Sequence, residues 1–200
     1  MKIESNKLHY IFTYTIYSAS FFVLGLILVN ILPETSYIYQ GILRSFSEIE
    51  VVYSNKNLFD STLLFSLFTS ELKYLIFIFI SCLCVYRNLI IIVINSYKGF
   101  VTGIGCALFV RIISLNTQSQ TLAFITSLLY IILSLCLIFA NTLFSTDSML
   151  YSRRIIIPVK ITTLLKRKDT YSQLFKLLVF CGAIFIITLI KMGTLLYTVS

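Results

Sequence analysis

Lys98 stands with three glycines in one of the most apolar stretches of the chain, the segment NSYKGFVTGIG at 95–105. Lysine among glycines is the residue set of a phosphate-binding loop, which needs its lysine after the glycines, following a strand and opening a helix. Here Lys98 precedes Gly99, Gly103 and Gly105, and the neighbouring residues are apolar. The segment therefore does not predict a nucleotide site.

The glycines instead have the spacing of a helix-packing surface. Gly99 and Gly103 are four residues apart, so they lie on one face of a helix. This G-x-x-x-G pattern lets two membrane helices approach closely, and Gly105 widens the smooth surface. We expect these glycines to pack helices within the bundle, and contact with a ligand is the alternative. Lys98 is expected at the turn between two spans.

Residues that could bind a metal or do catalysis are scattered. Cys82 and Cys84 are separated by one residue, and neither a histidine nor a second cysteine pair has metal-ligand spacing beside them. The single histidine, His9, lies in the N-terminal tail, and no nucleophile has a base at recognisable spacing. The sequence predicts a protein that is not an enzyme and that uses no metal or cofactor.

The composition is that of a membrane protein. Of the 200 residues, 58% are hydrophobic and only 12% are charged, against about 25% charged in an average soluble domain. The mean hydropathy is +0.93. Because no polar block is long enough for a separate soluble domain, we predict a single all-α, polytopic membrane domain over residues 1–200.

Apolar runs predict about five transmembrane helices. The first run has no charge and ends at Pro33, which cannot continue a helix; about 20 helical residues suffice to cross the hydrocarbon core. Amphipathic helices are expected in the 34–73 insert and in the 144–173 loop. The predicted spans cover about 11–32, 74–95, 98–115, 121–143 and 174–197.

Charge placement predicts the orientation in the cell membrane. Cytoplasmic segments collect Lys and Arg, and the 144–173 loop is basic. The insert carries five acids. With five spans, the N-terminus and the basic loop lie inside, and the insert and the C-terminus lie outside. The basic residues of the loop are Arg153, Arg154, Lys160, Lys166, Arg167 and Lys168, and the acids of the insert are Glu34, Glu48, Glu50, Asp60 and Glu71.

The basic loop is expected to lie on the inner membrane surface as an amphipathic helix. Each basic residue near anionic lipid contributes about 1 kcal/mol of attraction. Aromatic residues that could stack on bases are nearly absent from the loop, so the lipid bilayer is favoured over nucleic acid as its partner.

Arg87 interrupts the second predicted span. It could snorkel to the cytoplasmic headgroups, or the helix could end earlier than drawn. Alternatively, an intramembrane charge can be a functional site.

Two segments resemble the stage II sporulation protein M family. KYLIFIFISCLCVYRNLIIIVINSYKGFVTGIGCALFV, at 73–110, is similar to a family segment in which an apolar run leads into a K-G-f-x-x-G-f motif and a further span. VLGLILVNIL, at 23–32, resembles the end of the family's first span. The best matching positions are Lys98, Gly99, Phe100 and Gly103.

This resemblance implies a bacterial membrane scaffold with a role in sporulation. Such scaffolds anchor peptidoglycan-remodelling partners at the septum during engulfment, so other membrane or cell-wall-remodelling proteins are the expected partners. The alternative is a permease-like subunit of an ABC-type peptide exporter or immunity system, in complex with an ATPase. A homo-oligomer stays open, because G-x-x-x-G can serve one chain or two.

Overall fold

The computed structural model describes residues 2–33, 35–45, 61–82, 84, 86–116, 120–154 and 168–199. Regular secondary structure in these residues is α-helical, which confirms the predicted helical class. The helices are α1 (Lys2–Ile31), α2 (Tyr37–Ser45), α4 (Ser61–Ser81), α5 (Arg87–Asn116), α6 (Gln120–Arg154) and α8 (Lys168–Val199).

Four of the described helices are long and apolar enough to cross a membrane, one fewer than the five predicted. Each contains well over the ~20 residues that span the hydrocarbon core. Their apolar side chains also face outward along much of their length, as lipid contact requires. The four segments are Lys7–Ile31, Arg87–Ser114, Gln120–Tyr151 and Tyr171–Thr194.

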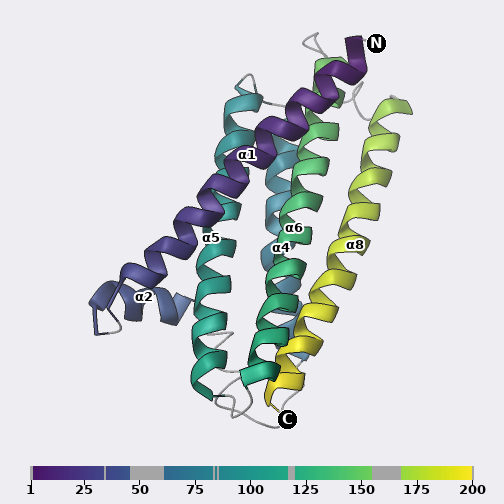
Figure 1. The fold of residues 1–200 in the computed structure, drawn as a ribbon. Coiled ribbons are helices and arrows are strands. Elements are labelled where there is room, and N and C mark those ends of the chain that lie inside the picture. The colour runs from purple at the N-terminus through teal and green to yellow at the C-terminus, as the bar shows by residue number, and fades with distance from the viewer. Residues whose placement is uncertain are drawn as a thin grey trace.

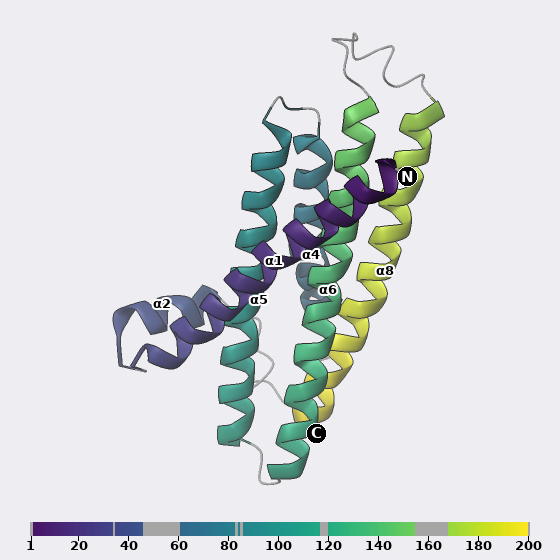
Figure 2. The same ribbon diagram turned by 45° about the horizontal axis from the view of Figure 1, so that its top comes forward.

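The long helices form a bundle that α1 crosses at an angle. α4, α5, α6 and α8 run side by side, whereas α1 lies obliquely over α5 and α6 (Figure 1). The rotated view shows the same crossing, with α2 beyond the end of α1, beside α5 and away from α8 (Figure 2). The first turns of α1 lie near the end of α6, where Lys7 Nζ forms an ion pair with Oδ1 of Asp147 over 3.7 Å.

The predicted boundary between spans 74–95 and 98–115 is wrong. α5 is one continuous helix from Arg87 to Asn116, and Lys98 lies inside it rather than at a turn. The chain turns earlier, after α4 ends at Ser81. A charge at the centre of a membrane helix costs about 2.5–3.5 kcal/mol, so starting a helix at Arg87 places this charge near an end.

The two predicted amphipathic segments have different outcomes. Within the 34–73 insert, α2 is amphipathic, with Tyr39 buried and Tyr37 and Ile38 exposed; residues 61–73 belong to α4. Within the 144–173 loop, residues 144–154 continue α6 and 168–173 begin α8. The helix expected between them falls on residues 155–167, which lie outside the described residues.

Candidate functional site

Glycines bring α1 and α5 into backbone contact. A Cβ atom added at Gly99 would overlap the carbonyl oxygen of Ser18, and one added at Gly103 would overlap that of Phe22. Gly25 of α1 faces the Phe100 carbonyl in the same way. Small residues allow such close approach in membranes, where packing rather than the hydrophobic effect holds helices together.

Two side-chain hydrogen bonds fix the register of this crossing. The Ser18 hydroxyl donates to the Asn95 carbonyl over 3.2 Å. Nearer the start of both helices, the Tyr14 hydroxyl donates to Oδ1 of Asn88 over 2.9 Å. α1 is therefore positioned on α5 by polar contacts as well as by shape.

A buried ion pair joins α5 to α4. The Lys98 Nζ lies 2.5 Å from each carboxylate oxygen of Glu71. It donates a hydrogen bond to Oε1 and forms an ion pair with Oε2. The two side chains are just 6% and 12% exposed. Lys98 Nζ also lies 4.5 Å from the centre of the Tyr74 ring, a cation–π contact from the same helix as Glu71.

Lys191 of α8 brings a second ammonium group toward this pair. Its Nζ lies 4.2 Å from the centre of the Tyr130 ring on α6. That ring stacks on Phe109 of α5, with ring centres 3.8 Å apart. Lys191 also interacts electrostatically with Glu71. Lys191 thus adds a second cation within electrostatic range of Glu71, and the residues involved come from four helices.

The ion pair lies deep in the bundle. Lys98 is 11 residues from the start of α5, or about 16 Å at 1.5 Å per residue. Half of the hydrocarbon core is about 15 Å. Charges at this depth are expensive unless they are paired, so the neutralising contact explains how the middle of α5 can hold a lysine.

Polar side chains continue from the ion pair along the α5–α6 interface. Asn95 Nδ2 donates to the Ser145 hydroxyl over 2.8 Å, and that hydroxyl donates to the Asn141 carbonyl over 2.8 Å. One turn further along α6, Ser148 accepts a 3.0 Å hydrogen bond from Gln173 Nε2 of α8. We name the full set the polar ladder. It comprises Gln173, Ser148, Ser145, Asn95, Asn141, Lys98, Glu71, Lys191 and Tyr130.

The polar ladder is nearly as long as the membrane is thick. Its ends on α6, Tyr130 and Ser148, are 18 residues apart, which is about 27 Å along a helix. Asn95, Asn141 and Ser145 are each at most 1% exposed. The ladder is therefore an internal feature of the bundle and not a polar stripe on its surface.

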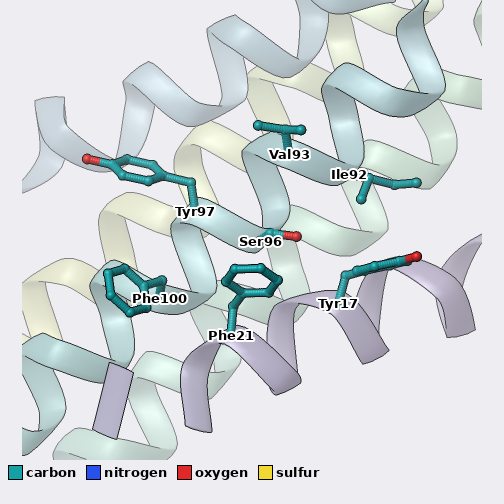
Figure 3. A pocket seen from close by; sticks show the side chains of 7 residues that line it. All are labelled: Tyr17, Phe21, Ile92, Val93, Ser96, Tyr97 and Phe100. Carbon is teal, nitrogen blue, oxygen red and sulfur yellow. The ribbon is translucent and has the colours of Figure 1, made fainter. Parts of the chain in front are cut away.

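A separate apolar groove opens beside the α1–α5 crossing. Its volume is about 410 Å³, and Figure 3 shows Tyr17 and Phe21 of α1 pointing toward the α5 residues that form its other wall. Tyr17 and Tyr97 are about half exposed, so the groove faces outward. Its lining residues are Tyr17, Phe21, Ile92, Val93, Ser96, Tyr97 and Phe100.

The structure separates the residues singled out in the sequence. Arg87 is the first residue of α5, next to the turn from α4. Gly105 is buried, two residues beyond the contact with α1, and Phe100 lines the groove. Arg153, Arg154 and Lys168 lie at the facing ends of α6 and α8. Lys160, Lys166 and Arg167 lie outside the described part of the chain.

The turn between α4 and α5 contains two different cysteine environments. Cys84 is exposed, whereas Cys82 is 5% exposed. Burial raises the pKa of the Cys82 thiol from 9.0 to about 12, because the thiolate is poorly solvated there. The Cys82 thiol donates a hydrogen bond to the Ile78 carbonyl over 3.1 Å.

The sequence alone does not identify Glu71 as the partner of Lys98, because Glu71 lies in the segment assigned to the external insert. It also does not single out Lys191 and Asn141, members of the polar ladder on α8 and α6. Their signal is a charged or amide side chain in line with apolar core residues: Glu71 shares a face of α4 with Leu75 and Ile78.

Comparisons with family models, curated proteins and solved structures found no match to this chain.

Proposed function

We propose that this protein is a non-enzymatic membrane scaffold that crosses the cell membrane five times and positions cell-wall-remodelling partners. α4 would supply the fifth span. It has 21 residues, or about 31 Å, and its Leu75 and Ile78 pack with residues of α6 and α8. Its antiparallel course beside α5 supports a crossing rather than a surface position.

Five crossings in this order give the orientation expected from charge. The first turns of α1, the turn from α4 to α5, and the facing ends of α6 and α8 lie at one end of the bundle (Figure 1). Arg87, Arg153, Arg154 and Lys168 are at that end. Since cytoplasmic segments collect basic residues, we assign that end to the cytoplasm, and α2 to the outside.

The observation that carries the scaffold proposal is the anchoring of α2. Tyr39 is buried in an apolar cluster with Val29 of α1 and Leu108 of α5. The Arg111 guanidinium lies 5.1 Å from the centre of its ring. α2 is thus held against two spans instead of being attached only through the chain.

The free side of α2 is suited to a protein partner. Tyr37 is 90% exposed and Ile38 is 60% exposed, and aromatic residues are enriched in protein interfaces. The resemblance of Lys98, Gly99, Phe100 and Gly103 to the stage II sporulation protein M motif suggests the partner class, namely peptidoglycan-remodelling proteins. Sporulation is the corresponding process.

The test is purification from native membranes through a C-terminal tag, with mass spectrometry of the co-purifying proteins. Cell-wall hydrolases without an ATPase are expected, and the double variant Tyr37→Ala/Ile38→Ala should lose them. Phe175→Ala, at a 69% exposed position on α8, is the matched control and should retain them. Recovery of an ATPase without hydrolases would overturn the scaffold proposal.

The polar ladder favours a second candidate, a permease-like subunit of an ABC-type exporter. Polar groups inside membrane domains often mark substrate or ion pathways, and this ladder covers about 27 Å of depth. In that case the basic loop would contact the ATPase. Neutralising Lys166, Arg167 and Lys168 should then abolish ATPase association, and unchanged association would count against this candidate.

A further inference from the structure

The centre of the polar ladder contains buried polar atoms that have no hydrogen-bond partner among the described residues. Both Nδ2 and Oδ1 of Asn141 are buried with no hydrogen-bond partner among the described residues. The same holds for Oδ1 of Asn95. Oε2 of Glu71 accepts no hydrogen bond in addition to its ion pair with Lys98. Most buried polar atoms in proteins are hydrogen-bonded to protein or to water.

These atoms lie at similar depth in the bundle. The hydrogen bond between Asn95 and Ser145 sets the antiparallel register of α5 and α6. Lys98 is one turn further along α5, and Asn141 is one turn back along α6, so the two reach the same level. Lys98 contacts Glu71 directly. The unpartnered atoms of Asn95 and Asn141 and the ion pair therefore lie at about the same level of the bundle.

We propose that water molecules bind inside the bundle, between the amides of Asn95 and Asn141 and the Lys98–Glu71 ion pair. A structural water makes about three hydrogen bonds to otherwise unsatisfied buried groups, and the four unpartnered atoms are enough for one such water. In a membrane interior an unsatisfied amide is especially costly. Bound water would satisfy Asn141 and the second oxygen of Glu71 together.

Bound water would allow proton exchange at the buried Glu71 carboxylate, which a purely anchoring role does not require. Water hydrogen-bonded to Glu71 can exchange protons with the carboxylate. The hydroxyls of Ser145 and Ser148 continue from Asn141 toward the end of α6 and Gln173.

Solid-state NMR of the protein in lipid vesicles tests the proposal directly. Magnetisation transfer from water to the Asn141 side-chain amide should be at least several-fold faster than to the Ile113 methyl groups, which are fully buried in an apolar cluster. Asn141→Leu identifies the amide signal by removing it. If Asn141→Leu does not insert, Asn141→Ser removes the same signal. Transfer no faster than to Ile113 would overturn the proposal.

Thermal unfolding supplies an independent measurement. If water satisfies the Asn141 amide, Asn141→Leu expels that water and should leave the melting temperature equal to or below that of the wild type. A dry, unpartnered amide predicts the opposite, because replacing it with an apolar group removes an unsatisfied polar group. A melting temperature clearly above wild type would therefore contradict bound water.

Discussion

Lys98 on α5 and Glu71 on α4 form an ion pair with Nζ 2.5 Å from both carboxylate oxygens, in the middle of α4 and largely shielded from the surroundings. The pair joins two helices that are consecutive in the chain but have no other acid–base contact among the described residues. It makes a lysine tolerable in an otherwise apolar helix, and it dictates what should happen when either partner is removed.

Removing the carboxylate should destabilise the bundle strongly. Glu71→Gln leaves the Lys98 ammonium buried without an anion, a change that typically costs about 3–5 kcal/mol. Chemical or thermal unfolding in detergent measures the loss. Phe77→Leu, at a 58% exposed apolar position of the same helix, is the control and should change stability by under about 0.5 kcal/mol.

Removing both charges should recover much of that loss. The double variant Glu71→Leu/Lys98→Met replaces the pair by apolar groups of similar size, which is often neutral or stabilising for buried pairs. A double variant less stable than Glu71→Gln alone would show that the pair is not the main determinant at this position.

Larger residues at the helix crossing should separate α1 from α5. Gly103→Val introduces a side chain where the Phe22 backbone lies, and overpacking typically costs about 1–3 kcal/mol. Gly182→Val and Gly193→Val are matched controls, because both glycines are exposed and a Cβ atom at either position meets nothing within 4 Å. Equal melting temperatures for Gly103→Val and the controls would refute the proposed tight crossing.

The two cysteines of the α4–α5 turn should report the number of spans. With five crossings and a cytoplasmic N-terminus, a membrane-impermeant maleimide should label exposed Cys84 in inverted vesicles but not in intact cells. If α4 did not cross, Cys84 would be labelled from the outside. The measurement is mass spectrometry of the labelled protein, with the other cysteines replaced.

Cys82 should resist the same reagent at neutral pH. Maleimide reacts with the thiolate, and a pKa of about 12 keeps Cys82 protonated until the pH approaches that value. Its reactivity should therefore increase with pH across the alkaline range in which the fold survives. Labelling of Cys82 as fast as that of Cys84 at pH 7 would show that the turn is open.

Tyr39 should control how firmly α2 is held. Tyr39→Ala removes the aromatic ring from the cluster on α1 and α5 and from Arg111, so local opening should rise by about tenfold or more, which corresponds to about 1.4 kcal/mol. The readout is the rate of trypsin cleavage after Arg44 in α2. Tyr37→Ala, at an exposed position, should leave the rate unchanged.

The class of this protein follows from its amino-acid sequence alone. Long apolar runs with few charges must be helical in a membrane, because only internal hydrogen bonds can satisfy the backbone there. The spacing of Gly99 and Gly103 likewise indicated a helix-packing face, since the periodicity of an α-helix is local.

The positions of the turns and the pairing of the charges follow from the packing of the helices. Arg87 and Lys98 look alike in sequence, as single cations in one apolar stretch. Lys98 pairs with Glu71, 27 residues earlier in the chain, and can therefore lie in the middle of α5. Arg87 instead lies at the start of that helix, beside the turn from α4. The free-energy cost of a charge in hydrocarbon depends on whether it is paired. Which residue pairs with it depends on how the helices pack, and the linear sequence does not show that packing.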